Sequence, residues 1–468
     1  MSKRNKRIYL LSVAIILAIC CMLANKPAGA AGSKKPIQNG QKMYDTQSNI
    51  INAHGGGFTK VGDYYYWIGE NRHNDVLVSC YRSKDLQSWE FRGDLLTRKS
   101  HPELANANIE RPKVIYNEAT KQFVMWMHYE LRSDYGYARA AVAVSSSIEQ
   151  PFTYLRSFRP LDNMSRDCNL FLDDDGVAYF ISSTRENRDM NIYELTSSYL
   201  DIKQKVSTLW VDAQREAPAL VKRGSYYFMV TSYCTGWEPN QGKYAFTSSL
   251  KGKWSSLKDV GSPTTFDTQP TFIIPIQGSK STSYLYVGDR WDPTQYFEST
   301  YVFLPIKFEN DTTLSISWNR TVSIDTKKGS VSGKSSTPKE YRIKCRNTGK
   351  YVIPKSGFIG DVKLSYTNDS LRWVVEHVGK GLVKIKHSTS KQYLDVDPDG
   401  ACRLSNGTDS RSQLWQIQQQ KDGWSYLANQ QAGGMLSITK DAKSSLPMLR
   451  CATSESGKQL FLLAPAYQ

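Results

Sequence analysis

The sequence has no cluster of cysteines and histidines at metal-ligand spacing. Its 468 residues include only 8 cysteines and 6 histidines, and no Cys-x-x-Cys pair occurs. Structural zinc sites need such ligands close together, so we expect no metal and no cofactor. Outside the first thirty residues the cysteines are widely scattered, and their pairing cannot be deduced from the sequence; they are Cys80, Cys168, Cys234, Cys345, Cys402 and Cys451.

The chain also lacks any block of lysine and arginine, although its formal net charge is +16. Positive charge that is spread along a chain argues against a nucleic-acid-binding stripe and allows mild attraction to acidic polymers. A hydrophobic content of 40% over this length is enough to bury a full core. We therefore expect a folded protein of two or three domains that does not bind nucleic acid.

No long apolar run follows the one near the N-terminus. The basic start MSKRNKR, the apolar run after it and a small-residue site ending at Ala30 are typical of a signal peptide over residues 1–30. We expect cleavage there and a secreted, periplasmic or cell-surface protein. A retained membrane anchor is the alternative, and lipidation at Cys20 or Cys21 is less favoured because no small residue precedes either in the pattern of a lipoprotein site. Removing five positive residues of the segment, Lys3, Arg4, Lys6, Arg7 and Lys26, lowers the net charge from +16 to +11.

Five similar stretches divide residues 40–325 into repeats. Each starts at a turn and continues with alternating aromatic and β-branched residues, the period-2 pattern of a strand. The starts lie 49 to 59 residues apart: GDYYYWIGE, KQFVMWMHY, DGVAYFISS, GSYYFMVTS and STSYLYVGD. Five matching all-β units predict a five-bladed β-propeller. A β-sandwich is the alternative, but it does not account for five matching units.

A second periodicity follows a Lys/Gly/Ser/Thr-rich run at residues 326–337, which we interpret as a linker. The stretches GKYVIP, KQYLDV and GGMLSI recur 42 residues apart, and LRW, QLW and QLF recur beside them. Three short all-β repeats over residues 338–468 predict a β-trefoil. The segment resembles ricin-type lectin modules, whose Gln-x-Trp motif is intact here only at Gln413–Trp415.

The repeat signature of this module is interpreted as core rather than as a binding site. Sugar binding in such a module would need an acidic residue and an aromatic residue in a neighbouring loop. Asp395 and Asp397 in YLDVDPDG are the best candidates, and the first and third repeats lack this pair.

Four carboxylates stand in or beside the first four propeller repeats: Glu70, Glu110, Asp167 and Glu216. Strands of all blades meet around one central depression, so acidic residues at matching places can share a pocket. A single acidic residue next to an arginine is usually a surface ion pair, but recurrence in successive repeats favours a site. The run DDDG at Asp173–Gly176 is interpreted as a turn, because it lacks the later ligands of a calcium loop.

These motifs resemble glycoside hydrolase family 43, which holds a general acid in a Glu-Gly/Ala-Pro motif and an aspartate in a motif like SRDCNLFLDDDG. INAHGGGF, IERPKVIY, REAPAL, TSYCTGW and TQPTF are similar to its exo-β-1,3-galactanase branch. The resemblance implies inverting hydrolysis of β-1,3-galactan or arabinogalactan. It assigns the general acid to Glu216 and the modulator of the acid's pKa to Asp167.

The aspartate that serves as base in most of family 43 is missing from the first strand. Asp63 lies in a turn that the other repeats share, so we interpret it as a turn former. The resemblance suggests Gln269 instead. An amide is a poor base at neutral pH, so Gln269 is expected to position the attacking water, and His54 is the next candidate.

The resemblance also implies that Glu70 and Glu110 accept hydroxyls of the sugar, with Tyr135, Thr235 and Trp237 lining the subsite. Two other functions stay open. A carbohydrate-binding protein without catalysis fits the missing base and the lectin-like module. An arabinofuranosidase or xylosidase fits the family but not the branch motifs. The intact REAP and SRD motifs favour an enzyme.

Overall fold

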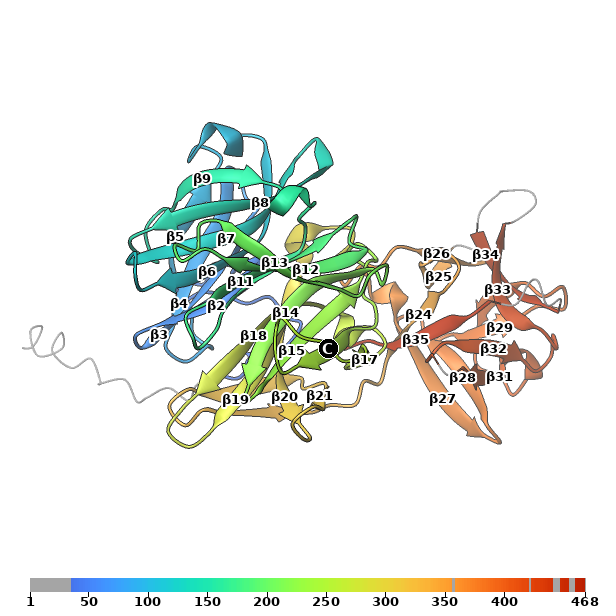
Figure 1. Ribbon diagram of the computed structural model, residues 1–468. Helices are drawn as coiled ribbons and strands as arrows, with labels where there is room; N and C mark the ends of the chain where they lie inside the picture. The colour runs from blue at the N-terminus through green and yellow to red at the C-terminus, as the bar shows by residue number, and fades with distance from the viewer. Residues whose placement is uncertain (1–34, 356–357, 421, 441–446, 454–458, 468) are drawn as a thin grey trace, which may run out of the picture. The chain divides into compact units, whose positions relative to one another are not determined.

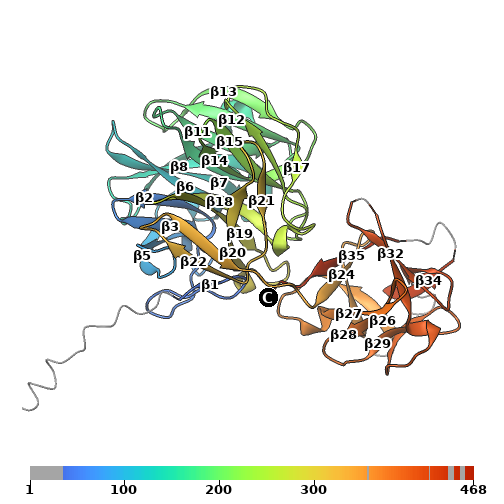
Figure 2. The same cartoon turned by 90° about the horizontal axis from the view of Figure 1, so that it is seen from below.

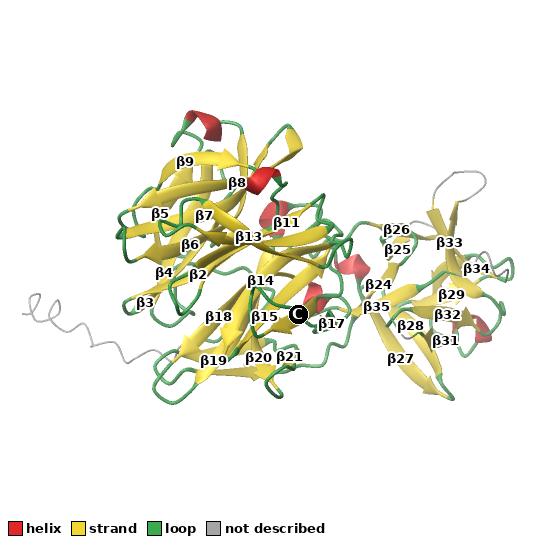
Figure 3. Cartoon of the chain, in the orientation of Figure 1, coloured by secondary structure: helices red, strands yellow, loops and turns green. Residues whose placement is uncertain are grey.

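The computed structural model describes residues 35–355, 358–420, 422–440, 447–453 and 459–467. Strands dominate this part of the chain, and its only helical segments are short 3-10 turns (Figure 3). They are η1 (Pro102–Leu104), η2 (Pro160–Asp162), η3 (Thr265–Asp267), η4 (Tyr296–Glu298), η5 (Asp369–Leu371) and η6 (Arg411–Gln413). No helix of the described residues is long and apolar enough to cross a membrane. The expected signal peptide, with Cys20 and Cys21, lies outside the described residues.

Five antiparallel sheets of four strands follow one another along the chain (Figure 1, Figure 2). The first is β2 (His54–Val61), β3 (Tyr64–Glu70), β4 (Val76–Ser83) and β5 (Glu90–Thr97). The second is β6 (Ala107–Asn117), β7 (Gln122–Leu131), β8 (Asp134–Ser145) and β9 (Thr153–Phe158). The third is β10 (Cys168–Leu172), β11 (Ala178–Thr184), β12 (Asp189–Leu195) and β13 (Ile202–Leu209). The fourth is β14 (Arg215–Arg223), β15 (Tyr226–Tyr233), β16 (Lys243–Thr247) and β17 (Lys258–Asp259), and the fifth is β18 (Gln269–Gln277), β19 (Thr282–Arg290), β20 (Thr300–Phe308) and β21 (Leu314–Ile316).

The five sheets close into a ring through their first strands. β2 contacts β6, β6 contacts β10, β10 contacts β14, β14 contacts β18, and β18 contacts β2. This cyclic order places one edge of every sheet around a common axis. Such small repeated sheets are typical of a propeller-like fold.

The five aromatic repeats form the second strand of each sheet, not the strand at the axis. β11 is buried along its whole length, and β15 and β19 are buried over most of theirs. A second strand is covered by a strand on each side and by neighbouring sheets, which explains why its side chains are the most uniformly apolar and aromatic. The catalytic candidates come mainly from the first strands.

A three-stranded sheet lies outside the five. It contains β1 (Ile37–Gln38), β22 (Thr321–Asp325) and β23 (Ser330–Lys334), in the order β1-β22-β23. Residues 330–334 lie within the segment expected to be a linker, yet they pair with β22 from Thr321↔Lys334 to Asp325↔Ser330. The Gly and Ser residues of this segment form a hairpin strand.

The C-terminal strands have their own sheet and core. They are β24 (Tyr341–Cys345), β25 (Tyr351–Lys355), β26 (Phe358–Val362), β27 (Trp373–Gly379), β28 (Leu382–His387), β29 (Tyr393–Val396), β30 (Cys402–Ser405), β31 (Trp415–Gln419), β32 (Ser425–Asn429), β33 (Met435–Lys440), β34 (Pro447–Ala452) and β35 (Phe461–Pro465). Trp373, Trp415 and Phe461 each begin a strand and are fully buried. The indole nitrogens of Trp373 and Trp415 donate to carbonyls 21 residues earlier, Val352 at 3.2 Å and Leu394 at 3.1 Å. This equivalence is compatible with a trefoil and confirms that the repeat motif is core.

Candidate active site

A bulge stands at the same place in three of the first strands. The register shifts between His54 and Gly57, between Glu110 and Lys113, and between Glu216 and Ala219. The residue after the leading one has positive φ in each strand, at Gly55, Arg111 and Ala217. A non-glycine residue in this region costs roughly 1–2 kcal/mol, and bulges of this kind re-aim side chains next to active sites. The bulge therefore marks His54, Glu110 and Glu216 as equivalent positions.

A cavity of about 500 Å³ is lined by most of the propeller residues that the sequence singles out. They are Glu70, Glu110, Tyr135, Asp167, Glu216, Trp237 and Gln269. Thr235 and His54 are exceptions. Thr235 does not line this cavity, and its hydroxyl donates to the carbonyl of Glu238 at 2.6 Å. The reason is local, since the turn of the TGWEP loop uses the Thr235 side chain to close on itself.

Glu216 is almost fully buried, with 7% of its surface exposed. Its Oε2 accepts a hydrogen bond from Asn187 at 2.8 Å, and its Oε1 accepts one from Gln269 at 2.8 Å. Burial raises the pKa of Glu216 to about 8, and the negative charge of Asp167 adds to the rise while Arg111 opposes it. A carboxylic acid with a raised pKa can keep its proton at neutral pH and donate it.

Asp167 lies just before β10 and is 8% exposed. Its Oδ1 pairs with Nε of Arg111 at 2.9 Å. The carboxylate is thereby fixed in place, and it still contributes to the raised pKa of Glu216. This is the arrangement that a pKa modulator requires.

Gln269 begins β18 and contacts four groups. Its Nε2 donates to Glu216 Oε1 at 2.8 Å and to Ser232 Oγ at 3.2 Å. Its Oε1 accepts from Trp291 Nε1 at 2.9 Å and from Nη2 of Arg111. The structure thus places the amide directly beside the candidate acid.

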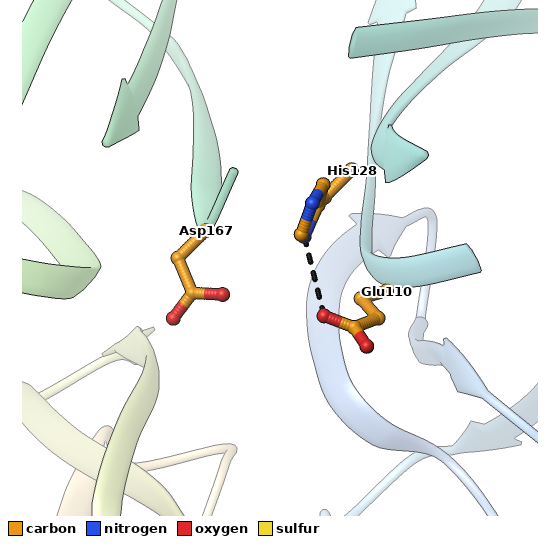
Figure 4. Close-up of side chains that lie close together, drawn as sticks. All are labelled: Glu110, His128 and Asp167. Atoms are coloured by element: carbon orange, nitrogen blue, oxygen red, sulfur yellow. Dashed lines mark ion pairs between the residues drawn. The ribbon is translucent and has the colours of Figure 1, made fainter. Parts of the chain in front are cut away.

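The carboxylate of Glu110 is held by an ion-pair network. Nδ1 of His128 lies 3.2 Å from Glu110 Oε2, and Nε2 of His128 lies 2.9 Å from Glu130 Oε1. Figure 4 shows Glu110 and His128 side by side, with Asp167 across from them. Burial alone would lower the pKa of His128, but Glu110 and Glu130 raise it to about 9. Burial alone would raise the pKa of Glu110, but His128 and Arg72 hold it well below its usual range.

One potential metal-ligand atom from each of Glu110, His128 and Asp167 lies within 4.8 Å of the other two, a spacing that can hold a cation. Both ring nitrogens of His128 already face carboxylates, Nδ1 toward Glu110 and Nε2 toward Glu130. Asp167 is already paired with Arg111. In this structure the three side chains therefore belong to a network of charge pairs.

Arg72 joins Glu70 to Glu110. Its Nη2 lies 2.8 Å from Glu70 Oε2 and 3.1 Å from Glu110 Oε1. Burial raises the pKa of Glu70 to about 7, although Arg72 opposes the rise. Tyr135, at the rim, donates its hydroxyl to Glu110 Oε2 at 2.9 Å. Two oriented carboxylates, one arginine and one phenol can recognise the hydroxyls of a sugar.

Aromatic rings stand beside these charges. Trp237 stacks on Trp291 with centroids 5.8 Å apart, and Trp291 stacks on Tyr296 at 5.9 Å. Trp237 is 36% exposed and lines the cavity. An exposed indole beside carboxylates is the usual platform for the apolar face of a pyranose.

His54 occupies the position in the first strand that is equivalent to Glu110 and Glu216, but it does not line the cavity. Its Nδ1 lies 3.0 Å from Asp289 Oδ1, and its ring stacks on Tyr301 at 4.5 Å. His54 is only 2% exposed and serves the packing of β2 against the fifth sheet. The geometry gives no support to His54 as a base.

The two acidic candidates of the C-terminal module differ. Asp395 is 8% exposed, and its Oδ2 accepts from Gln413 at 3.3 Å and from Ser405. Its Oδ1 accepts from the backbone of Val396 at 2.8 Å. Both carboxylate oxygens of Asp395 are therefore used in hydrogen bonds within the module. Asp397 pairs with Arg403 at 2.7 Å, and its side chain is 25% exposed.

A profile of the glycosyl hydrolases family 43 matches residues 57–301, more than half of the chain. The chain belongs to glycoside hydrolase family 43. A second profile, ricin-type beta-trefoil lectin domain-like, matches residues 369–446. No curated protein matches the chain.

Solved structures of family 43 galactanases are similar to this family 43 chain. An exo-β-1,3-galactanase from Clostridium thermocellum is 41% identical, with a TM-score of 0.63, and the match covers 92% of this chain and 99% of that one. A family 43 β-1,3-galactosidase with galactodeoxynojirimycin is 33% identical, with a TM-score of 0.57, over 60% and 98%. A variant exo-β-1,3-galactanase from Phanerochaete chrysosporium with β-1,3-galactotriose is 26% identical, with a TM-score of 0.62, over 92% of each chain.

Sequence reasoning missed several residues that hold this site, among them Arg72, Arg111, His128 and Trp291. Arg111 follows Glu110 in the IERP motif and was considered only as an exposed partner of that glutamate. It is 3% exposed and contacts Asp167 and Gln269 instead. The only signal in the sequence was an arginine directly before a proline. Arg72, His128 and Trp291 had no local signal.

Proposed function

We propose that this protein is an exported exo-β-1,3-galactanase. It releases galactose from the end of a β-1,3-galactan chain, such as the backbone of arabinogalactan. The observation that carries the proposal is the buried Glu216 carboxyl, with its pKa raised to about 8, beside Asp167 in a cavity of about 500 Å³. The similarity to exo-β-1,3-galactanases over 92% of the chain supports the choice of substrate.

In the proposed reaction Glu216 donates its proton to the glycosidic oxygen as the bond to the anomeric carbon breaks. Water attacks that carbon from the opposite face and releases a proton to solvent water, from which Glu216 is reprotonated for the next cycle, so the first product is α-galactose. Burial and the negative charge of Asp167 keep the acid protonated by raising its pKa. Gln269 stands in for the missing aspartate base. Its proposed role is to position reacting groups and not to remove a proton, since an amide is a poor base.

Glu110, Glu70, Tyr135 and Trp237 form the proposed galactose subsite. Galactose carries an axial 4-hydroxyl, and a fixed carboxylate beside an aromatic platform can distinguish it from an equatorial one. Glu110 suits this role because His128, Arg72 and Asn108 fix its orientation, the last through a bond of 2.6 Å.

We propose further that the ring of five sheets is a five-bladed β-propeller and that the C-terminal module is a carbohydrate-binding β-trefoil. The cyclic contacts from β2 to β18 support the first, and the buried repeat positions Trp373, Trp415 and Phe461 support the second. Export through cleavage of residues 1–30 is the proposed route to a polysaccharide outside the cell.

The test is incubation of the full chain with β-1,3-galactan, followed by chromatography of released sugar and proton NMR of the first product. Galactose that appears first as the α-anomer supports the proposal. Binding of galactan without release of galactose would instead identify a carbohydrate-binding protein, and release of arabinose or xylose from matching substrates would identify a different glycosidase.

A further inference from the structure

All four hydrogen-bonding positions of the Gln269 amide are filled. The two acceptor positions on Oε1 face Arg111 and Trp291, and the two hydrogens on Nε2 face Glu216 and Ser232. Arginine and the indole N–H are donors only. The atom that faces both of them must therefore be the carbonyl oxygen, which fixes the orientation of the amide.

We propose that Arg111 and Trp291 are positioning residues for Gln269, which hold it as an ordinary amide with its NH₂ group directed at Glu216. The inference rests on the proposed function, because it assigns a role within that reaction. It goes beyond that function by naming the residues that fix the tautomer and orientation of the Gln269 amide. It also names the NH₂ group as the part of the amide that takes part in the reaction.

The two donors are themselves firmly anchored. Nε of Arg111 pairs with Asp167 at 2.9 Å, and its Nη1 donates to the carbonyl of Pro270 at 3.0 Å. One guanidinium thus ties the modulator of the acid to the backbone and side chain at the start of β18. Trp291 is 6% exposed and stacks between Trp237 and Tyr296. Neither donor can turn away from Gln269 without losing these other contacts.

This contact set excludes the form in which Gln269 would be a base. An amide can accept a proton on nitrogen only as its imidic acid tautomer, in which the oxygen carries a hydrogen. That hydrogen would point at Arg111 or Trp291, which have no lone pair to accept it. Gln269 therefore acts through its N–H groups. As Glu216 loses its proton to the leaving oxygen, the hydrogen bond that the Gln269 N–H donates to the forming carboxylate strengthens.

The test begins with Trp291→Phe in the full chain. Phenylalanine keeps an aromatic ring in the stack and removes only the N–H donor. We expect kcat on β-1,3-galactooligosaccharides to fall about tenfold and KM to change by less than about twofold. The matched control is Trp126→Phe, which removes an indole N–H bond of 2.8 Å to Tyr199 in the blade core. The control should lower the melting temperature without changing kcat.

A double-mutant cycle separates positioning from general destabilisation. If Trp291 acts through Gln269, Trp291→Phe should have no further effect on kcat in a Gln269→Ala background. Full additivity of the two changes would overturn the inference. Arg111→Lys, which retains a cation but loses the fork of donors, should reduce kcat in the same non-additive way, and Trp291→Phe keeps the test decisive if that variant does not fold.

The outcomes distinguish the inference from the function on which it rests. If the wild-type chain hydrolyses galactan and Trp291→Phe retains its full kcat, the inference alone is wrong. If the wild-type chain releases no galactose, the proposed function fails and the inference fails with it.

Discussion

The amide nitrogen of Gln269 lies 2.8 Å from Oε1 of Glu216, although 53 residues separate them in the chain. One residue begins β18 and the other stands at the bulge of β14. The group that replaces the missing base is therefore a direct neighbour of the acid. A change at Gln269 should therefore alter the ionisation of Glu216.

Glu216→Gln should abolish nearly all hydrolysis of β-1,3-galactan. General acid assistance is worth about 10²–10⁴ in rate, and glutamine cannot supply the proton. The fold should be unchanged, as measured by circular dichroism and melting temperature. Glu118→Gln is the matched control, since Glu118 is 81% exposed and pairs only with Lys121. Activity of Glu216→Gln within threefold of wild type would eliminate Glu216 as the acid.

The pH profile should report the acid directly. Glu216 must be protonated to act, so kcat/KM should be high below its pKa of about 8 and fall as the pH rises through that value. Asp167→Asn removes the negative charge that helps to raise this pKa, so the falling limb should move to lower pH. A limb that stays in place in Asp167→Asn would contradict the modulator role.

Gln269→Glu should shift the pH optimum upward. A carboxylate at this position would lie against Glu216, and a second negative charge raises the pKa of the acid. We expect kcat to fall as well, because the variant replaces an N–H donor with an acceptor. The measurement is the pH–rate profile of wild type, Gln269→Ala and Gln269→Glu. A kcat in Gln269→Glu equal to that of wild type would show that position 269 works as a base.

His128 should contribute stability that depends on pH. Its pKa is raised from 6.5 to about 9 in the folded chain. The contribution is fully present below about pH 6.5 and is lost as the pH rises through about 9. His128→Gln should therefore lower the melting temperature more at pH 6 than at pH 10. It should also raise KM more than it lowers kcat, because it frees Glu110 rather than the acid. Equal losses of melting temperature at both pH values would contradict the charged state.

Substitutions of Asp395 and Asp397 in the C-terminal module should affect different properties, the first its stability and the second its binding to galactan. Asp395→Ala removes the acceptor of Gln413 and Ser405 and should lower the melting temperature of the module. Asp397→Ala removes a partly exposed ion pair with Arg403, which is worth little to stability, and should weaken binding to galactan if this loop binds sugar. Unchanged affinity of Asp397→Ala in affinity electrophoresis would exclude that loop.

The prediction of small repeated sheets could be made from the sequence because alternation of aromatic and β-branched residues is a local property. YYYWIGE forms β3 within its predicted stretch, and YYFMVTSY forms β15, which extends one residue beyond its predicted stretch. Which strand lines the axis could not be predicted. Glycine or proline interrupts the apolar pattern in four of the five first strands, β2, β6, β14 and β18. Their bulges exist only when two strands pair with unequal numbers of residues.

Glu216, Asp167 and Gln269 were determined as candidates by the sequence alone, since the motifs around them are contiguous. Only the tertiary structure decided what each side chain contacts. Arg111 contacts Gln269, 158 residues away in the chain, and Asp167 at the start of the neighbouring sheet, and no local sequence pattern predicts either contact. The contacts of Thr235 with Glu238 and of His54 with Asp289 likewise became visible only in the folded chain. A residue type sets which bonds a side chain can make, whereas closure of the ring sets which partners lie within reach.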